Sequence, residues 1–173
     1  ISKGFGGTLA SIGIIIGFGV MMGEIFEASG AAERMAQTFI KKLGKGREEI
    51  ALAITGFLVS IPIFCDSGFV ILSPLTKAIS RKTKKSTVTL GISLAAGLVI
   101  THSLVPPTPG PVGVAGLFGV NVGSLILWGI VMAIPMTIAA IIYAKYIGKK
   151  IYQIPSEDGE GWERPEYQEP VYD

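Results

Sequence analysis

Residues 50–76 carry the strongest indication of architecture in this chain, and they read IALAITGFLVSIPIFCDSGFVILSPLT. These 27 residues include one charged side chain, Asp66, in the middle of the run FCDSG. Two complete membrane crossings need about 40 residues, more than this segment offers. A single crossing would put its ends on opposite sides of the membrane, yet both flanks are basic, and basic loops mark the cytoplasmic side. The pattern therefore predicts a re-entrant helical hairpin over residues 49–80.

The composition is typical of a helical membrane protein with several crossings. Mean hydropathy is +0.55, and 16% of the residues are charged, against about 25% in soluble domains. Residues 1–150 carry a net charge of +8, from 14 basic and 6 acidic side chains, whereas residues 151–173 carry −6, from 1 basic and 7 acidic ones. The basic residues lie in short loops between apolar runs, which indicates membrane topology and argues against a nucleic-acid surface.

Cysteine and histidine are too scarce for several classes of site. The chain has one of each, Cys65 and His102. An intrachain disulfide needs two cysteines, and Cys- or His-rich metal sites need several ligands of these types. We therefore expect no metal ion and no cofactor.

The remaining segments complete a predicted all-α integral membrane fold. They are a transmembrane helix at 4–26, an amphipathic interfacial helix at 30–44, a broken transmembrane helix at 86–119, a transmembrane helix at 122–148 and an acidic cytoplasmic loop or tail with little fixed structure at 151–173. The break follows from four prolines between positions 106 and 111, since proline has no N–H and cannot continue a helix. The sequence thus predicts a transporter repeat with three spans, one of them broken, and one re-entrant hairpin.

Asp66 and His102 are the candidate functional residues that titrate. An aspartate at the centre of a bilayer costs about 2.5–3.5 kcal/mol, so such a residue indicates function. Asp66 would carry a coupling proton or accept hydrogen bonds from a polyol; the alternative is a structural carboxylate satisfied by the N-terminus of the next helix. His102 suits proton exchange near neutral pH; the alternative is a hydrogen bond to backbone groups freed by the break.

The other candidate residues are small, and they lie at the two interruptions. They are Ser67 and Gly68 in the hairpin and Ser103, Thr108 and Gly110 at the break. Helix N-termini that follow an interruption direct partial positive charge at an anion, which predicts a substrate with a carboxylate. The alternative is that the hydroxyls only satisfy the interrupted backbone.

Three motifs resemble the gluconate permease (GntP-type) family: GFGGTLASIG at 4–13, IPIFCDSGFV at 61–70 and HSLVPPTPGP at 102–111. The resemblance runs through nearly all of residues 4–170. It implies a carrier, not an enzyme, that takes up gluconate or a related sugar acid with protons across a prokaryotic inner membrane by alternating access. It places Cys65, Asp66, Ser67 and Gly68 at a binding tip, opposite His102, Ser103, Thr108 and Gly110.

The resemblance also indicates which partners to expect. Members of the family are much longer than 173 residues, so the remaining half of the transporter is an expected partner, with the lipid bilayer, protons and a small anionic substrate. Whether the transporter forms a homo-oligomer is left open by the sequence. Alternatives are a permease for D-serine or another small hydroxylated carboxylate, a channel-like pore, an intramembrane enzyme that uses Cys65 or Asp66, and a purely structural fragment of a membrane assembly.

Overall fold

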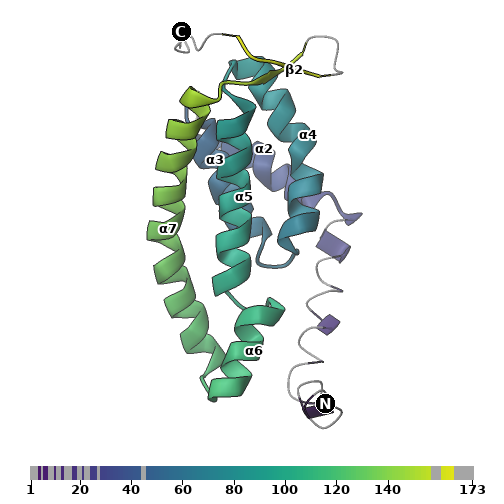
Figure 1. Cartoon of the computed structure of the whole chain (residues 1–173). Helices are drawn as coiled ribbons and strands as arrows, with labels where there is room; N and C mark the ends of the chain where they lie inside the picture. The colour runs from purple at the N-terminus through teal and green to yellow at the C-terminus, as the bar shows by residue number, and fades with distance from the viewer. Residues whose placement is uncertain are drawn as a thin grey trace.

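The computed structural model describes residues 28–43, 46–156 and 161–165, together with isolated positions among the first 26 residues. These ranges contain six helices and one pair of short strands (Figure 1). The elements are α2 (Ala31–Leu43), α3 (Glu48–Val59), α4 (Cys65–Thr83), α5 (Thr87–Leu104), α6 (Pro109–Phe118), α7 (Val122–Lys150), β1 (Ile154–Pro155) and β2 (Trp162–Glu163). The transmembrane helix expected at 4–26 lies mostly outside the described residues.

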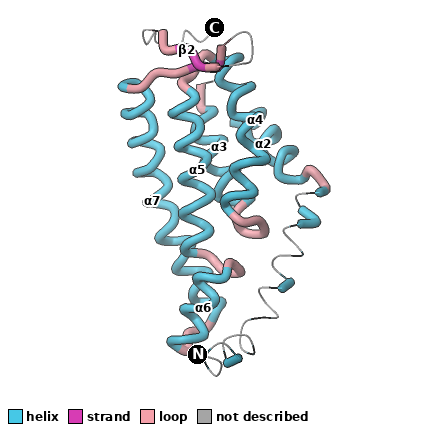
Figure 2. Tube along the Cα trace, turned by 45° about the vertical axis from the view of Figure 1, so that its right-hand side comes forward, coloured by secondary structure: helices cyan, strands magenta, loops and turns pink. Residues whose placement is uncertain are grey.

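Helix α5 stands at the centre of the bundle. It packs against α3, α4 and α7, and Figures 1 and 2 show α7 and α4 on opposite sides of it. The core that joins these helices is built of fully buried leucine and valine side chains: Leu52, Val59, Leu72, Leu90, Leu94 and Leu98. Helices α3 and α5 run in the same direction, because Glu49 pairs with Lys85 just before α5 and Gly56 approaches Leu94 and Leu98 further along.

Glycines allow α3 and α5 to approach each other closely. A Cβ atom at Gly56 would lie 2.6 Å from the carbonyl oxygen of Leu94, and a Cβ at Gly97 would lie 2.9 Å from the Phe57 nitrogen and overlap the carbonyl oxygen of Ala53. These neighbours are backbone atoms, which cannot rotate away as a side chain can. Small residues at helix crossings serve this purpose in membrane proteins.

Replacing Gly97 with alanine is therefore expected to destabilise the bundle by about 1–3 kcal/mol, the usual cost of overpacking. Gly91 is the matched control, because it lies in the same helix and a Cβ there meets nothing within 4 Å. Alanine improves helix propensity equally at both positions, by up to about 1 kcal/mol. Thermal unfolding of the two variants in detergent separates the effects: equal midpoints would contradict the close approach.

Helices α5 to α7 provide the two membrane-length segments among the described residues. They are Thr87–Phe118, counted through the break, and Val122–Lys150, whose most apolar stretches of 18 residues have mean hydropathies of 1.9 and 2.5. In the second, only 17% of the most apolar stretch is buried, so most of the apolar surface of α7 is left uncovered by the described residues. Its exposed side chains include Leu127, Val131, Ile134, Ile138 and Ile142, a surface suited to lipid or to further protein.

Helix α4 contains a proline whose missing hydrogen bond is replaced locally. Pro74 lies inside the helix and has no N–H to donate to the carbonyl of Val70. The hydroxyl of Ser73 donates to that carbonyl instead, at 3.1 Å. The helix therefore continues past Pro74 to Thr83 and spans 19 residues in all.

Residues 151–156 and 161–165, which we term the C-terminal strap, hold more structure than the sequence predicted. Strands β1 and β2 pair antiparallel, with Ile154 opposite Glu163. The strap is also attached to the α4–α5 loop and to the start of α5: the Tyr152 hydroxyl donates to the carbonyl of Lys84 at 2.5 Å, and the Thr87 N–H donates to that of Gln153 at 2.7 Å. The all-α prediction thus missed a two-residue strand pair, because its stabilising partners lie almost 70 positions earlier in the chain.

Candidate functional site

Two interruptions of helical structure form the centre of the candidate site. In the first, α3 ends at Val59 and α4 begins at Cys65, within the segment 49–80 predicted to be re-entrant. In the second, α5 ends at Leu104 and α6 begins at Pro109, within the predicted broken helix. How these elements lie in a membrane stays a prediction.

The first turn of α4, which we call the hairpin tip, carries Cys65, Asp66, Ser67 and Gly68, the four residues expected at the binding tip. Asp66 is exposed, Ser67 is half-buried and Gly68 is buried. The Cys65 thiol lies 3.8 Å from the Asp66 carboxylate. A Cβ at Gly68 would approach the Leu98 side chain to 2.8 Å, so this glycine lets the start of α4 pack directly on α5. An acidic residue in the first turn is favourable, because the helix N-terminus carries partial positive charge.

The break between α5 and α6 is held by Thr108. This side chain is buried, and its hydroxyl lies 2.7 Å from the carbonyl oxygen of His102 and 2.9 Å from that of Val105. A hydroxyl has one proton to donate, so it serves two carbonyls at the end of α5 in turn. Thr108 therefore provides a hydrogen-bond donor to backbone carbonyls at the break.

Only one of the first three residues of α6 has a backbone N–H group. Pro109 and Pro111 have no N–H, which leaves that of Gly110. Gly110 is exposed, and a Cβ there would meet nothing within 4 Å. Ser103, at the other side of the break, is exposed as well. Both residues are accessible to a ligand.

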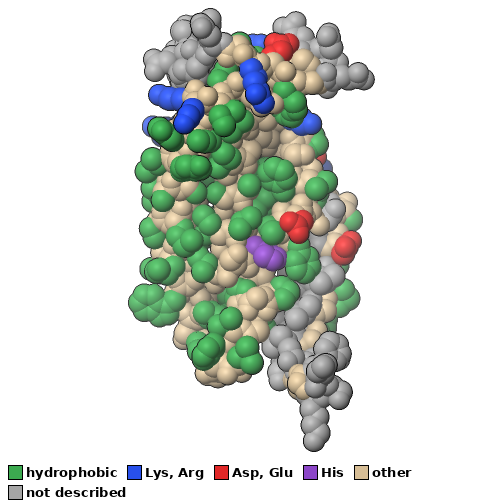
Figure 3. All heavy atoms as spheres, in the orientation of Figure 1, with side chains coloured by type: hydrophobic (Ala, Val, Ile, Leu, Met, Phe, Trp, Pro, Cys, Tyr) green, Lys and Arg blue, Asp and Glu red, His purple; other side chains and the backbone are tan. Residues whose placement is uncertain are grey.

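The hairpin tip and the break meet at Phe64 and His102. The centroids of these two rings lie 5.5 Å apart, with the planes tilted by 55°. The Asp66 carboxylate is close enough to interact electrostatically with the His102 imidazole. Figure 3 shows the histidine side chain on a largely apolar face, with carboxylate side chains nearby and the lysines and arginines gathered at one end of the molecule. The two predicted titratable residues thus belong to one neighbourhood.

Three buried polar atoms lie where α3 and α5 end. The hydroxyls of Ser60 and Thr101 and the Nδ1 atom of His102 are buried without a hydrogen-bond partner in the described part of the chain. Buried polar groups are usually paired, so each such group needs an explanation. Ser60 was not among the predicted site residues; the signal available in the sequence was a serine within an otherwise apolar run, two positions before Pro62.

A separate group of charges joins α3, the α4–α5 loop and α7 at the basic end. The Lys85 ammonium lies 2.8 Å from the Glu48 carboxylate, contacts that of Glu49 and donates to the carbonyl of Gly46 at 2.6 Å. The Lys145 ammonium lies 2.9 Å from Glu49. Glu48 and Glu49 are 5% and 2% exposed, so these charges stabilise the fold only while they remain paired.

The pKa values of this group follow from burial and pairing. Burial is the largest influence and alone would raise the pKa of Glu48 and of Glu49. The hydrogen bonds and charge of Lys85, backbone N–H groups and, at Glu49, Lys145 together outweigh it, so both pKa values lie below the usual value for glutamate. Burial alone would lower the pKa of Lys85, but the two carboxylates outweigh it and raise that pKa. All three groups are therefore charged at neutral pH.

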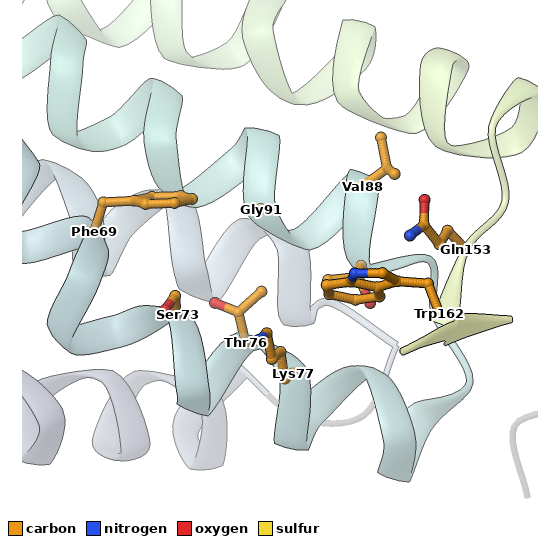
Figure 4. A pocket seen from close by; sticks show the side chains of 9 residues that line it. Phe69, Ser73, Thr76, Lys77, Val88, Gly91, Gln153 and Trp162 are labelled. Atoms are coloured by element: carbon orange, nitrogen blue, oxygen red, sulfur yellow. The ribbon is translucent and has the colours of Figure 1, made fainter. Parts of the chain in front are cut away.

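Metal-binding side chains do not gather anywhere in the described ranges: no three His, Cys, Asp or Glu residues come together there. A cavity of about 480 Å³ lies between α4, α5 and the C-terminal strap (Figure 4). None of the predicted site residues lines it. The tip and the cavity are thus two separate features of this chain.

Comparison with known proteins relates the chain to a family of permeases. Residues 1–170 match the GntP family permeases. The chain is 61% identical to an uncharacterized permease of Haemophilus influenzae, over 87% of the chain and 31% of that protein. It is 40% identical to a gluconate permease of Bacillus subtilis, over 86% of the chain and 34% of that protein.

A third relative is the Gnt-II system L-idonate transporter of Escherichia coli, 39% identical over 81% of the chain and 32% of that protein. The chain thus spans about a third of the length of these curated relatives. No solved structure matches it significantly. The family and these relatives are permeases and not enzymes, and the chain belongs to the GntP permease family.

Proposed function

We propose that this chain is part of a secondary active transporter that takes up gluconate or a related sugar acid together with protons across the inner membrane, by alternating access. Relatives described as gluconate permeases and as an L-idonate transporter support the substrate class. The whole transporter would include further protein, since the relatives are about three times as long as the matched region.

The contact between the hairpin tip and the break is the observation that carries the proposed mechanism. Phe64 and His102 touch, so the N-terminus of α4 faces the end of α5. In this proposal the substrate carboxylate binds near the N-termini of α4 and α6, where amide groups and helix dipoles favour an anion. The substrate hydroxyls bond to Ser67, Ser103 and the Gly110 amide, while Thr108 maintains the break.

Proton coupling is assigned in this proposal to Asp66 and His102. Asp66 is exposed at the tip, and His102 lies within the reach of its charge. Protonation of either group adds one positive charge to the site as the anion binds. The complex of substrate and proton therefore carries less net negative charge than the substrate alone, which lowers the cost of its passage through the membrane.

An uptake measurement tests this function. The complete permease that contains this chain is reconstituted in liposomes, and labelled gluconate uptake is measured with and without an inward proton gradient. We expect the gradient to drive accumulation above the external concentration, because coupling converts it into a substrate gradient. Equilibration without accumulation would contradict coupled transport and favour a channel-like pore.

Competition defines the substrate in the same preparation. L-Idonate is expected to compete with labelled gluconate, since both are hydroxylated carboxylates. D-Serine is the alternative substrate: accumulation of D-serine without uptake of gluconate would keep the carrier and overturn the proposed substrate.

A further inference from the structure

The cavity between α4, α5 and the C-terminal strap has the side chains of a binding site. Its volume is about 480 Å³, within the range of small-molecule pockets. Figure 4 shows polar side chains from α4 on one side, with Trp162 and Gln153 entering from the strap. The polar and aromatic residues that matter here are Ser73, Thr76, Lys77, Gln153 and Trp162.

Lys77 supplies a positive charge at this cavity. It is exposed, and no carboxylate among the described residues forms an ion pair with it. Its ammonium lies 5.3 Å from the centroid of the Trp162 ring, a cation–π distance. An anion that enters the cavity therefore meets the Lys77 ammonium beside the Trp162 ring.

Hydrogen-bonding groups line the wall between Lys77 and the hairpin tip. The hydroxyls of Ser73 and Thr76 donate to carbonyls of their own helix, each at 3.1 Å. Each oxygen keeps lone pairs that can accept a proton from a ligand hydroxyl. The side-chain amide of Gln153 points toward the same space (Figure 4) and both donates and accepts.

The shape of the cavity suits an extended ligand. Gly91 of α5 faces it without a side chain, and a Cβ there would meet nothing within 4 Å. Phe69, one residue after Gly68 of the hairpin tip, lies at the end opposite Trp162 (Figure 4). The cavity therefore reaches from the first turns of α4 to the basic end of the bundle.

We propose that this cavity is a second site for a small hydroxylated carboxylate, on the path between the hairpin tip and the cytoplasm. The Lys77 ammonium pairs with the carboxylate, the Trp162 ring covers the carbon chain, and Ser73, Thr76 and Gln153 bind hydroxyls. The ligand class rests on the proposed function, because it is that of the proposed substrate.

A cysteine placed in the cavity reports its occupancy directly. In the complete permease with its native cysteines replaced, Gly91→Cys is labelled with a maleimide in neutral detergent, with and without D-gluconate. We expect gluconate at about ten times its Kd to slow labelling about tenfold. Sorbitol, an open-chain polyol without a carboxylate, should not slow it.

Three further variants show which residues hold the ligand. Lys77→Met should abolish the protection. Lys82→Met, which removes an exposed lysine of the same helix that does not line the cavity, should retain it. Asp66→Asn should also retain it, because the tip is not part of the cavity.

Several results would overturn this second site. With wild-type residues in the cavity, these are an absence of protection by gluconate or equal protection by sorbitol. Among the variants, they are protection that survives Lys77→Met or protection that is lost in Asp66→Asn. Protection by phosphatidylglycerol but not by gluconate would assign the cavity to a lipid headgroup. Uptake separates this proposal from the proposed function. Accumulation of gluconate without protection overturns the cavity site alone, whereas protection without accumulation overturns the transport mechanism and leaves the site.

Discussion

Replacement of Asp66 by asparagine is expected to reduce gradient-driven gluconate uptake to the level of empty liposomes. Asparagine has nearly the same shape but cannot bind and release a proton. Asp66 is exposed in the first turn of α4, so its loss should leave folding almost unchanged; an exposed carboxylate near a helix N-terminus contributes about 0.3–1 kcal/mol. The measurement is labelled uptake under an inward proton gradient, with equal amounts of variant and wild type in the membrane.

Two controls separate proton coupling from substrate binding at this position. Asp66→Glu keeps a carboxylate and should retain part of the uptake. Exchange of labelled for unlabelled gluconate without a gradient needs no net proton movement, so Asp66→Asn should retain some exchange. If the asparagine variant accumulated gluconate as the wild type does, Asp66 would be a structural carboxylate and the proton carrier would have to be sought at His102.

Replacement of Lys85 by methionine is expected to destabilise the protein by about 3–5 kcal/mol, because it leaves a buried carboxylate without its partner. Glu48 would lose its only ion pair among the described residues, and Glu49 would keep Lys145 alone. Lys145→Met is the matched control, since its side chain is 51% exposed and exposed pairs contribute about 0–1 kcal/mol. Thermal unfolding in detergent would give the difference; equal shifts for the two variants would contradict this account.

The same variant should also change the pH dependence of stability. The pKa values of Glu48 and Glu49 are lowered in the folded protein. Their contribution to the free energy of unfolding is therefore present above the pKa of glutamate in the unfolded chain, and it is lost as the pH falls through the pKa values of the folded state. The pKa of Lys85 is raised, so its contribution is complete below the unfolded pKa of lysine and is lost only as pH rises through the folded value. Lowering the pH from 7 to about 4 should therefore reduce the difference in unfolding temperature between the wild type and Lys85→Met.

Local chemistry made the helix interruptions predictable. Four prolines between 106 and 111 forbid continuous helical hydrogen bonding, and α5 ends at Leu104 while α6 begins at Pro109. A lone aspartate in an apolar run indicated the hairpin tip, where α4 begins at Cys65. These features depend on residues that are neighbours in sequence, so periodicity and residue type were sufficient.

Partnerships across the fold were not accessible in the same way. Lys85 and Glu49 are 36 positions apart, and the strap binds residues more than 60 positions earlier. Nothing in the local pattern around Lys77 or Trp162 indicated that they would share a cavity. Thr108 was predicted from its hydroxyl alone, and only the fold shows that this hydroxyl already serves the carbonyls of His102 and Val105.

The ion pairs of Glu48 and Glu49 hold the N-terminal end of α3, and the other end of this helix leads to the hairpin tip. In the proposed transport cycle, the tip would move about that fixed end. The 12 residues of α3 rise about 18 Å from that end to the tip, at about 1.5 Å per residue. A pivot of about 10° at the fixed end would thus carry the tip through about 3 Å, roughly the size of a water molecule. In the proposed transport cycle, opening or sealing the tip against the break would require only a small rotation of this kind, and the ion pairs of Glu48, Glu49 and Lys85 would stay intact.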